Sequence, residues 1–460
     1  LKKDLIVILN DNKMSISSSV GALSTYLTRL RTNPDYNRLR DDFKRLMEKS
    51  SFLKEETTTT IKRMEMGIKS LVMRGSFFEE LGFRYLGPIN GHNLRDLVNI
   101  LSRVKKLKGP IIVHVLTRKG KGYKFSEENP SLYHSASPFN FSTGEIRKKE
   151  GKSWSEVFGE TLIRLAKENN KIIAITAAMS EGTGLSKFKT EFPERFFDTG
   201  IAEEHMVTFA AGLASKGYRP VITIYSTFLQ RAYDQIIHDV ALQNLPVIFV
   251  IDRAGIVGPD GPTHQGIFDI AYLRYLPNMI IMAPKDEIEL QDMLYTAINT
   301  TENPVAIRYP KEKGLKGTEV KKFKHLKIGK AEVIQEGEEI AIFALGSMVK
   351  IAKEACKLLK EEKINPTLVN ARFVKPLDED LILNLTKKTK KLITLEEGIL
   401  KGGFGSAILE LLQDNAPDKY QIKRIGLPDK FIEQGERKEL LKKYGLNKEK
   451  IIKIVKEIMR

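Results

Sequence analysis

The apolar run VIFVI at residues 247–251 leads directly into the loop sequence DRAGIVGPDGPTHQG at residues 252–266. A short, continuous apolar run of this kind is typical of a parallel strand that is buried on both faces. The glycine-rich segment is too long to be a simple connection, because long structured loops in compact domains usually carry function. The sequence therefore predicts a parallel strand with a functional loop at its carboxyl end.

Other apolar runs alternate with helical patterns on both sides of this stretch. Strand-like runs occur at 172–176, 221–225 and 279–282, and helical patterns occur at 203–215, 230–242 and 287–298. Such alternation indicates a parallel sheet flanked by helices.

The same alternation extends toward both ends of the chain. Strands are predicted at 5–9, 110–116, 340–345, 366–369 and 392–395, and a polar helix is predicted at 36–49. The continuous apolar runs at 5–9 and 110–116 are typical of buried parallel strands. The run at 5–9 follows the first residue almost at once, without an initiator methionine, so we expect that residues preceding this strand are missing. The predicted fold class is α/β: three α/β domains with mainly parallel sheets flanked by helices, the first domain being incomplete.

Changes in the pattern set the expected domain boundaries. Between residues 123 and 152 the sequence is rich in Ser, Pro, Asn and Gly, which indicates a long connection. Ser153 and Glu156 then have the spacing of a capping box at the start of a helix. We predict a first domain at 1–125, a connecting segment at 126–150, and further domains at 151–318 and 319–460.

Composition and charge exclude several classes of protein. The chain of 460 residues is 42% hydrophobic, enough to bury real cores, but no apolar run has the length of a membrane span. Cys356 is the only cysteine, which excludes a disulfide framework and favours a reducing compartment, so we expect a cytoplasmic protein. The net charge of +17 comes from lysines mixed with glutamates, without interleaved aromatics. We therefore expect a solvated surface and neither nucleic acid nor membrane as partner, with a lysine-rich nucleic-acid binder as the alternative.

Polar clusters follow two other predicted strands. Residues 10–17 read NDNKMSIS, and asparagine and carbonyl oxygens at the end of a parallel strand are ligands that Mg²⁺ accepts. The alternative is a turn in which these side chains bind their own backbone. Glu203, in the run GIAEEH at 200–205, is either a functional carboxylate or a first-turn acid stabilised by the helix dipole. The aromatic residues at 224–234 are equally consistent with a core.

Together with the loop at 252–266, these clusters resemble the 1-deoxy-D-xylulose-5-phosphate synthase family of the transketolase superfamily. Further motifs carry the resemblance along essentially the whole chain: YLGPINGH at 85–92, KGKGY at 119–123, LYH at 132–134, RFVKPL at 372–377 and GLPD at 426–429. Asn90 departs from the family, which commonly has Asp there, and so does Gly398-Ile399 after Glu397, where an Asn is usual. The resemblance implies a diphosphate-binding first domain, a pyrimidine-binding second domain, and a C-terminal domain without a cofactor role.

The resemblance also implies thiamine diphosphate and Mg²⁺ as cofactors. Asn12 and the carbonyl of Met14 match two of the metal ligands, while a third, the Asp of a Gly-Asp-Gly segment, would precede the first residue. The resemblance thus implies a weak metal site and impaired activity for this chain. Glu203 matches the glutamate that hydrogen-bonds the ring nitrogen of the aminopyrimidine, and Phe228 matches the aromatic that stacks on that ring. Lys119 matches a position near the cofactor diphosphate.

The implied reaction condenses pyruvate with glyceraldehyde 3-phosphate to 1-deoxy-D-xylulose 5-phosphate with loss of carbon dioxide. It is the first step of the non-mevalonate isoprenoid pathway, and the resemblance implies a homodimer. His134, Asp260 and His264 match polar residues of the reaction pocket, and His264 is the candidate for proton transfer. The residues matched to the acceptor phosphate are Tyr225, Arg231, Arg253 and Arg308. Two alternatives stay open: a loop histidine bound by nearby backbone for His264, and a strand-end salt bridge for Arg308.

Rival functions also stay open. A transketolase or a 2-oxo-acid dehydrogenase subunit would share the metal segment and Glu203 but not the run at 252–266. One non-catalytic half of a split enzyme would keep the fold without the activity. Residues 402–406, GGFGS, resemble a phosphate-binding turn, although close packing of a strand against a helix is the stronger explanation.

Overall fold

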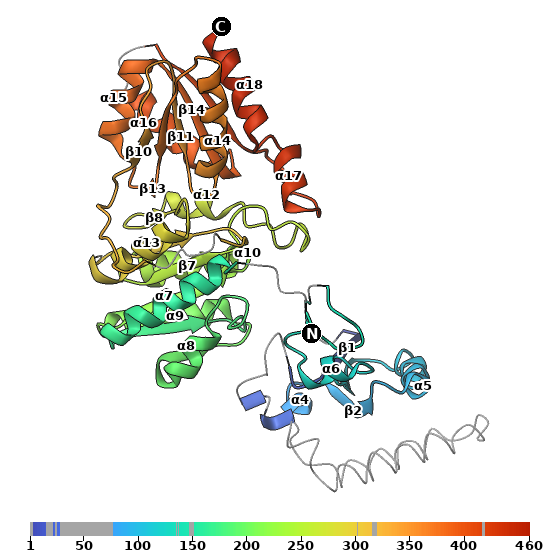
Figure 1. Ribbon diagram of the computed structural model, residues 1–460. Coiled ribbons are helices and arrows are strands. Elements are labelled where there is room, and N and C mark those ends of the chain that lie inside the picture. Colours follow the sequence, from blue (N-terminus) through green and yellow to red (C-terminus); the bar gives the residue numbers. More distant parts are fainter. Residues whose placement is uncertain are drawn as a thin grey trace, which may run out of the picture. The chain divides into compact units, whose positions relative to one another are not determined.

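The computed structural model in Figure 1 describes residues 3–14, 22–23, 25–27, 77–134, 136, 138–146, 151–300, 302–314, 320–415 and 419–460. The helix predicted at 36–49 lies outside the described residues. The chain divides into two compact units, Leu1–Lys148 (unit 1) and Lys149–Arg460 (unit 2). Both have parallel sheets flanked by helices, and the predicted α/β fold class is confirmed.

Unit 1 contains a three-stranded parallel sheet in the order β1-β3-β2. Its elements are β1 (Leu5–Asp11), α4 (Phe77–Glu80), β2 (Arg84–Asn90), α5 (Leu94–Val104), β3 (Pro110–Leu116) and α6 (Lys124–Glu128). The central strand β3 packs with α5 in a small apolar core. The strand predicted at 5–9 is confirmed, but its predicted burial is wrong: β1 is an edge strand, and Leu5 and Ile8 are 51% and 52% exposed.

Unit 2 begins with a seven-stranded sheet in the order β13-β8-β9-β7-β6-β4-β5. Its strands are β4 (Ile172–Thr176), β5 (Phe196–Asp198), β6 (Arg219–Tyr225), β7 (Ile248–Asp252), β8 (Ile280–Met282), β9 (Val305–Arg308) and β13 (Phe373–Lys375). All neighbours are parallel except β13, which is antiparallel to β8. The four strands predicted in this region, at 172–176, 221–225, 247–251 and 279–282, are confirmed within one residue or two at their ends.

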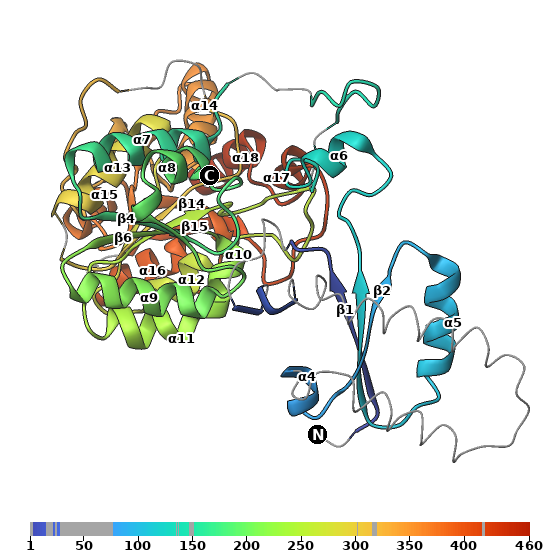
Figure 2. The same ribbon diagram turned by 90° about the horizontal axis from the view of Figure 1, so that it is seen from below.

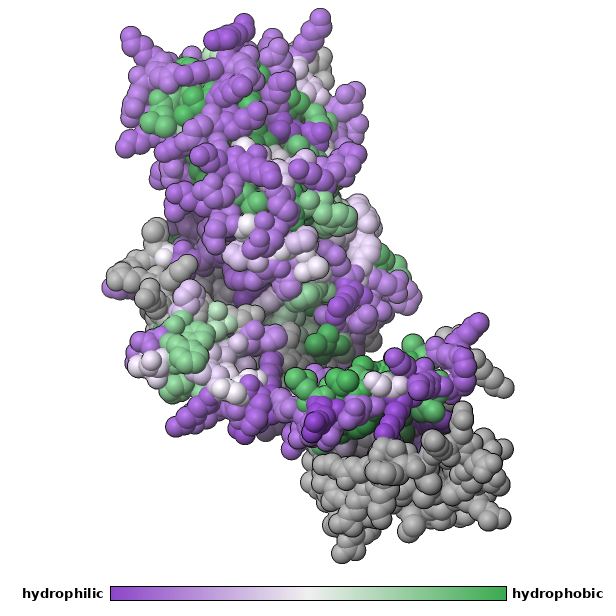
Figure 3. Space-filling model, turned by 90° about the vertical axis from the view of Figure 1, so that its right-hand side faces the viewer, coloured by the Kyte–Doolittle hydropathy of each residue, from purple (hydrophilic) through white to green (hydrophobic). Residues whose placement is uncertain are grey.

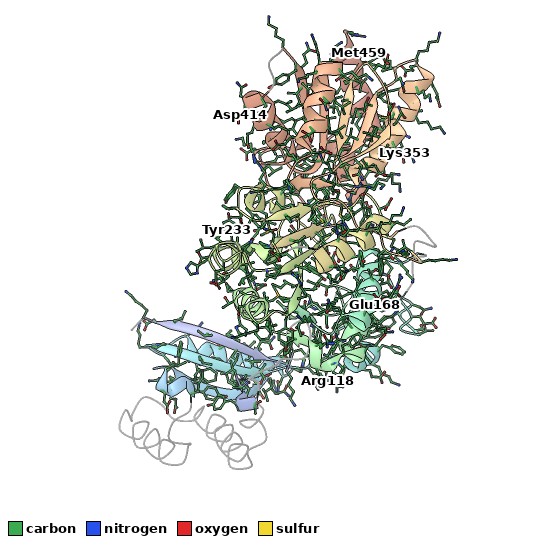
Figure 4. The ribbon with its side chains drawn as sticks, turned by 90° about the vertical axis from the view of Figure 1, so that its left-hand side faces the viewer. Arg118, Glu168, Tyr233, Lys353, Asp414 and Met459 are labelled. Atoms are coloured by element: carbon green, nitrogen blue, oxygen red, sulfur yellow. The ribbon has the colours of Figure 1, made fainter. Side chains whose placement is uncertain are left out.

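Helices cover both faces of this sheet. They are α7 (Trp154–Glu168), α8 (Ser186–Glu191), α9 (Glu203–Ser215), α10 (Ser226–Leu229), α11 (Tyr233–Gln235), α12 (Asp269–Arg274) and α13 (Glu287–Thr300), with the 3₁₀ turns η2 (Pro193–Arg195) and η3 (Gln230–Ala232) and the π-helix η4 (Ile236–Ala241). Figure 2 shows α7, α8 and α13 on one face and α9, α11 and α12 on the other. Figure 4 gives a side view, with Glu168 of α7 and Tyr233 of α11 on opposite sides of the sheet.

The first helix of unit 2 starts as the sequence predicts. The N–H of Ser153 donates to Glu156 Oε2 at 2.6 Å, and the N–H of Glu156 donates to Ser153 Oγ at 3.2 Å. These reciprocal bonds satisfy two of the backbone donors that a helix leaves free at its N-terminus. The helix predicted at 230–242 is helical but irregular, because it divides into η3, α11 and η4.

A five-stranded sheet in the order β10-β12-β11-β14-β15 completes unit 2. Its elements are β10 (Glu332–Gln335), β11 (Ala341–Ala344), α14 (Met348–Glu361), β12 (Thr367–Asn370), α15 (Glu379–Thr389), β14 (Lys391–Ile399), α16 (Phe404–Asn415), β15 (Gln421–Leu427), α17 (Arg437–Lys443) and α18 (Lys448–Met459). Only β10, among these described strands, runs antiparallel to its neighbour. The core of this sheet also takes in Ile256 and Ile267, which belong by sequence to the region of the seven-stranded sheet.

Residues 370–375, at the end of β12 and just after it, connect the two sheets of unit 2. Strand β13 leaves the five-stranded sheet and pairs with β8 of the other. Next to it, Arg372 Nε donates to Glu289 Oε1 at 2.6 Å, and Asn370 Nδ2 donates to Glu289 Oε2 at 3.0 Å. The predicted domain boundary at residue 318 stays a prediction, because both sheets belong to one compact unit.

The lysine-rich helices follow the expected amphipathic pattern. In α14 and α18 the apolar residues pack into the core of the five-stranded sheet, while Lys353 extends from the outer surface in Figure 4. The part of unit 2 that carries this sheet presents mainly hydrophilic side chains in Figure 3. Across the described ranges, none of the helices combines the length and the apolar character that crossing a membrane requires.

Candidate active site

Most of the predicted site residues in unit 2 lie at or just beyond the carboxyl ends of parallel strands. Tyr225 ends β6, Asp252 ends β7, and Glu203 begins α9 after β5. Ligands of open α/β sheets bind at this edge, because the loops that leave the strands converge there. The aromatic and charged clusters of the sequence therefore lie at the carboxyl edge of the seven-stranded sheet.

Glu203 is a buried carboxylate, whereas its neighbour Glu204 is exposed. The side chain of Glu203 is 3% exposed, and its Oε1 lies 3.2 Å from Nη1 of Arg231. The Arg231 side chain is itself 55% exposed. A first-turn acid that serves only the helix dipole has no reason to be buried. The geometry thus favours the functional interpretation of Glu203 over the alternative.

An aromatic wall stands beside this carboxylate. The rings of Tyr225 and Phe228 are stacked, with centroids 5.7 Å apart and an interplanar angle of 22°. The ring of His264 meets Phe228 edge-on at 5.4 Å, and the guanidinium of Arg231 lies 5.9 Å from the centroid of Phe228. Both aromatic residues are partly exposed and stand outside the core clusters. They do not fill a core, and so they can stack on a ligand.

Arg253 connects this wall to the end of β7. Its guanidinium carbon lies 3.7 Å from the ring centroid of Tyr225, Nη1 is 2.8 Å from Asp252 Oδ2, and Nη1 also donates to the carbonyl of Gly182 at 2.8 Å. Burial raises the pKa of Asp252, and the Arg253 charge opposes that effect. Burial also raises the pKa of Tyr225 to about 12, so its hydroxyl stays neutral. Arg253 adopts a φ of +58°, a strained value typical of functional loops.

The tip of the 253–266 loop carries the predicted residues Asp260 and His264. Lys311 Nζ donates to Asp260 Oδ2 at 2.6 Å, with both side chains partly exposed. The Nδ1 atom of His264 lies 3.0 Å from Thr263 Oγ1, and the backbone N–H of His264 donates to the carbonyl of Gly261. The second contact matches the alternative, a loop histidine bound by nearby backbone, but it uses the main chain of His264 and not the imidazole.

Arg308 is also a predicted site residue, but its side chain does not join the group around Tyr225 and Phe228. It is bound to other residues instead. Its Nε donates to Asp269 Oδ2 at 2.8 Å and its Nη2 to Asp269 Oδ1 at 3.2 Å, and Nη2 also donates to the carbonyl of Glu397 at 3.1 Å. Both residues are buried. These contacts match the alternative interpretation of Arg308, a strand-end salt bridge. Because the Nε and Nη2 donors already bind protein acceptors, the structure gives no support to a phosphate role for Arg308.

In unit 1, the predicted metal ligands form a turn. Asn12 Oδ1 accepts from the N–H of Met14 at 2.9 Å, and Asp11 Oδ1 accepts from the N–H of Lys13 at 3.1 Å. These contacts therefore match the alternative interpretation, in which the side chains bind their own backbone. Metal ligation by Asn12 and Met14 stays a prediction. No cluster of three or more His, Cys, Asp or Glu suited to a metal occurs in the described part of the chain.

Lys119 and His134 lie close together in unit 1. Burial lowers the pKa of Lys119, and it also lowers the pKa of His134, which the nearby Lys119 charge lowers further. A neutral imidazole beside an ammonium group is compatible with their predicted places near a diphosphate and a substrate. Their roles stay predictions, as do those of the residues in unit 2.

Two residues of the site, Gly182 and Lys311, were not predicted from the sequence. A Cβ on Gly182 would lie 1.9 Å from the Tyr225 hydroxyl oxygen, so only glycine permits the observed place of that ring. Lys311 is a partly exposed cation that pairs with Asp260. The glycine pair in the run SEGTG at 180–184, after the strand at 172–176, was a usable signal for Gly182. Nothing in the sequence near Lys311 distinguishes it from other surface lysines.

The buried carboxylate and the aromatic wall suit the pyrimidine end of thiamine diphosphate. Glu203 offers a buried carboxyl group for a hydrogen bond, and Phe228 offers a ring face. Arg231 lies next to both, 3.2 Å from Glu203 Oε1 and 5.9 Å from the ring centroid of Phe228. A flat, nitrogen-containing aromatic ring is the ligand class that uses both.

Comparison with known proteins agrees with this geometry. Residues 1–117 match the family model "1-deoxy-D-xylulose-5-phosphate synthase", residues 150–315 match "Transketolase, pyrimidine binding domain", and residues 329–451 match "Transketolase, C-terminal domain". The chain is 52% identical over 450 residues to the 1-deoxy-D-xylulose-5-phosphate synthase of Caldanaerobacter subterraneus subsp. tengcongensis and 50% identical over 462 residues to that of Syntrophus aciditrophicus. These alignments cover 98% and 100% of this chain and 72% and 71% of the relatives.

Solved structures show the same architecture. A split-gene transketolase, described as an inactive beta4 tetramer, is 32% identical with a TM-score of 0.60, over 67% of this chain and 99% of that chain. The transketolase of Campylobacter jejuni is 18% identical with a TM-score of 0.56, over 84% of this chain and 70% of that one. The second likeness concerns the fold only.

Proposed function

Because the chain belongs to the 1-deoxy-D-xylulose-5-phosphate synthase family of thiamine-dependent, transketolase-type transferases, we propose that it condenses pyruvate with glyceraldehyde 3-phosphate. The product is 1-deoxy-D-xylulose 5-phosphate, and carbon dioxide is released. The observation that carries the proposal is the buried Glu203 beside the Tyr225–Phe228 wall, at the carboxyl edge of the seven-stranded sheet.

Thiamine diphosphate, when bound, supplies the electron sink for the electron pair that remains when carbon dioxide leaves. Glu203 holds a proton at Oε1 or Oε2 against a pyrimidine ring nitrogen, and Phe228 fixes the ring plane by stacking. At the diphosphate end we assign Lys119, together with Mg²⁺ bound by Asn12 and the Met14 carbonyl. The turn at residues 11–14 has oxygen atoms of the type that Mg²⁺ prefers.

The bond changes balance with one added proton. The C1–C2 bond of pyruvate breaks, C1 leaves as carbon dioxide, and the electron pair of C2 forms the bond to the aldehyde carbon of the acceptor. The aldehyde oxygen then needs a proton. We assign its delivery to His264, whose imidazole can carry a proton on a ring nitrogen and meets Phe228 edge-on at the tip of the loop. Asp260, at the same loop tip, is assigned as polar lining of the pocket, and the role of His134 in unit 1 stays a prediction.

The acceptor phosphate requires cations with exposed donors. Arg231 and Lys311 meet this requirement with side chains that are 55% and 42% exposed. The Arg253 side chain is 14% exposed, whereas Arg308 is buried in its ion pair with Asp269. Tyr225 adds a neutral hydroxyl next to Arg253. We therefore assign the phosphate to Tyr225, Arg253, Arg231 and Lys311.

Product analysis with stoichiometry tests the proposal. The chain, supplied with thiamine diphosphate, Mg²⁺, pyruvate and glyceraldehyde 3-phosphate, should form 1-deoxy-D-xylulose 5-phosphate and carbon dioxide in a 1:1 ratio. Ketol transfer from xylulose 5-phosphate without carbon dioxide would indicate a transketolase, and carbon dioxide with an acyl product would indicate a 2-oxo-acid dehydrogenase subunit. Inactivity with intact cofactor binding would favour a non-catalytic role.

Assembly and location belong to the same proposal. We propose a homodimer that works in the cytoplasm, as expected from the family and from the single cysteine. Light scattering coupled to size-exclusion chromatography should give twice the mass of the 52.1 kDa chain. The mass of one chain would contradict the dimer.

A further inference from the structure

The loop between β7 and α12 has a buried stem and an exposed tip. Residues 254–258 and 265–267 are buried, whereas residues 259, 260, 262 and 263 are exposed. The tip carries Asp260 and His264, the residues assigned above to the reaction pocket. Glycine-rich backbone has many conformations open to it, so a tip of this kind needs external contacts to hold one position.

Glu397 of β14 makes the first such contact with the stem. Its carboxylate is buried, and Oε1 accepts from the backbone N–H of Ile256 at 2.7 Å. Its other oxygen, Oε2, accepts from Arg437 Nη2 at 2.7 Å and from Ser347 Oγ at 3.0 Å. The carboxylate thus joins the stem to α17 and to the start of α14.

The stem is shaped to receive this carboxylate. Gly255 has a φ of +83°, and a Cβ at this position would lie 2.4 Å from the carboxyl carbon of Glu397. Gly255 also exchanges two backbone hydrogen bonds with Gly266, at 2.6 and 2.8 Å, which close the stem. Close approach of the Glu397 side chain is therefore possible only because residue 255 is glycine.

Gln265 makes the second contact. Its Oε1 accepts from the N–H groups of Val257 at 2.7 Å and Gly258 at 3.3 Å, and its Nε2 donates to the carbonyl of Glu433 at 3.0 Å. Gln265 is buried and directly follows His264. Its amide therefore links both sides of the stem to the segment between β15 and α17.

We propose that Glu397 and Gln265 are positioning residues through which the five-stranded sheet holds the tip with Asp260 and His264 in place for the acceptor step. This inference rests on the proposed function. It gives the C-terminal part of the chain a role in the reaction, although the family resemblance implies no cofactor role for that part. A displacement of about 1 Å at a reacting group can cost about a hundredfold in rate, so contacts of this kind affect turnover.

The test compares Gln265→Ala and Glu397→Ala with Glu397→Gln in the full chain loaded with thiamine diphosphate and Mg²⁺. The alanine variants should lower kcat/KM for glyceraldehyde 3-phosphate about tenfold or more, the loss expected when a hydrogen bond that orders a site is removed. Deuterium exchange at the cofactor thiazolium and the affinity for thiamine diphosphate should stay at parent values. Glu397→Gln keeps an acceptor for the N–H of Ile256, and Arg437 keeps Glu312 at 3.1 Å, so this variant should stay within about threefold of the parent.

Amide hydrogen exchange gives a readout that does not require turnover. Exchange at residues 256–258 should accelerate in both alanine variants, while exchange in β6 stays unchanged. Arg372→Ala is the matched control, because it breaks the contact to Glu289 between the two sheets without touching the loop. It should lower the thermal midpoint yet leave acceptor kinetics and loop exchange at parent values.

The outcomes separate the two proposals. An inactive parent would contradict the proposed function, while the exchange data would still test the contacts to the stem. An active parent whose alanine variants keep parent loop exchange and acceptor kinetics would overturn the positioning role. A Glu397→Gln variant as impaired as Glu397→Ala would also overturn it, since the ion pair with Arg437 would then matter and the loop amide would not.

Discussion

Arg308 at the end of β9 and Asp269 at the start of α12 form a forked ion pair in the interior of unit 2, with N···O distances of 2.8 and 3.2 Å. Arg308 also donates to the carbonyl of Glu397, so the pair links the seven-stranded sheet, α12 and the five-stranded sheet. Removal of one partner from such a pair leaves an uncompensated buried charge.

We predict that Arg308→Ala lowers the stability of the fold by about 3–5 kcal/mol, because Asp269 would then be a buried charge without its partner. Activity of the remaining folded protein should fall equally with phosphorylated and unphosphorylated acceptors. Arg308→Lys should restore little, since an ammonium group cannot make the fork. Thermal unfolding and kinetics with glyceraldehyde 3-phosphate and glyceraldehyde measure both effects.

A double variant supplies the control for this prediction. Arg308→Met combined with Asp269→Asn removes both charges and should recover much of the lost stability. If Arg308→Ala instead unfolds like the parent and raises only the KM for the phosphorylated acceptor, Arg308 does bind the acceptor phosphate.

Glu203→Gln should fold and bind thiamine diphosphate but lose about 10²–10⁴ in turnover, because an amide cannot hold or release the proton at the pyrimidine nitrogen. Exchange of the thiazolium proton for deuterium in the bound cofactor should slow with it. The neighbouring Glu204 is exposed and provides the matched control, since Glu204→Gln should behave like the parent. Parent-like exchange in Glu203→Gln would remove Glu203 from the proposed role.

Lys311→Ala should raise the KM for glyceraldehyde 3-phosphate about tenfold, because one charge-assisted contact to the phosphate would be lost. Unphosphorylated glyceraldehyde should react equally well with the variant and the parent. Lys311→Arg keeps the positive charge beside Asp260 and should restore most of the acceptor affinity. Equal losses with both aldehydes would assign Lys311 to the structure of the loop instead.

The sequence predicts elements well where a local pattern determines them. The apolar runs of β4, β6, β7 and β8 and the capping box at Ser153 need only neighbouring residues, and each is confirmed. The exposure of β1 and the pairing of β13 with β8 depend on which strands stand at the sheet edges. Hydrophobic periodicity contains no information on that choice.

The same distinction between local pattern and long-range packing applies to the site residues. The motifs locate Glu203, Tyr225 and Phe228 near one sheet edge, because strand ends in a parallel sheet converge. The sequence leaves Arg308 open between a phosphate ligand and a salt bridge, since its partner Asp269 is 39 residues away. The fit of Gly182 against the Tyr225 hydroxyl likewise depends on the packing of two loops.

The glycine turn at 402–406 serves close packing and does not form a phosphate-binding turn. The N–H groups of Phe404 and Gly405 donate to the carboxylate of Glu396, both at 2.8 Å. A Cβ on Gly403 would lie 2.2 Å from Glu396 Oε2. The chain's own carboxylate therefore occupies the N-terminus of α16, the place where a phosphate would bind.

This buried carboxylate leads to a prediction on pH. Burial raises the pKa of Glu396 to about 7, against the lowering effect of the two backbone hydrogen bonds, whereas the unfolded chain should have a value of about 4.5. The folded state therefore binds more protons between these two values. The contribution of Glu396 to stability is complete below about pH 4.5 and is lost as the pH rises through about 7. At most about 3 kcal/mol is involved.

Urea unfolding at several pH values between 5 and 8 measures this effect in the parent and in Glu396→Gln, whose neutral amide does not titrate. The variant should gain stability relative to the parent as the pH rises, by up to about 3 kcal/mol across this range. Other buried acids such as Asp252 also titrate, but they cancel in the difference between the two proteins. Glu410→Gln, at an exposed position of α16, is the control and should show a constant difference. A constant difference for Glu396→Gln as well would mean that the backbone N–H groups of α16 keep Glu396 ionised throughout.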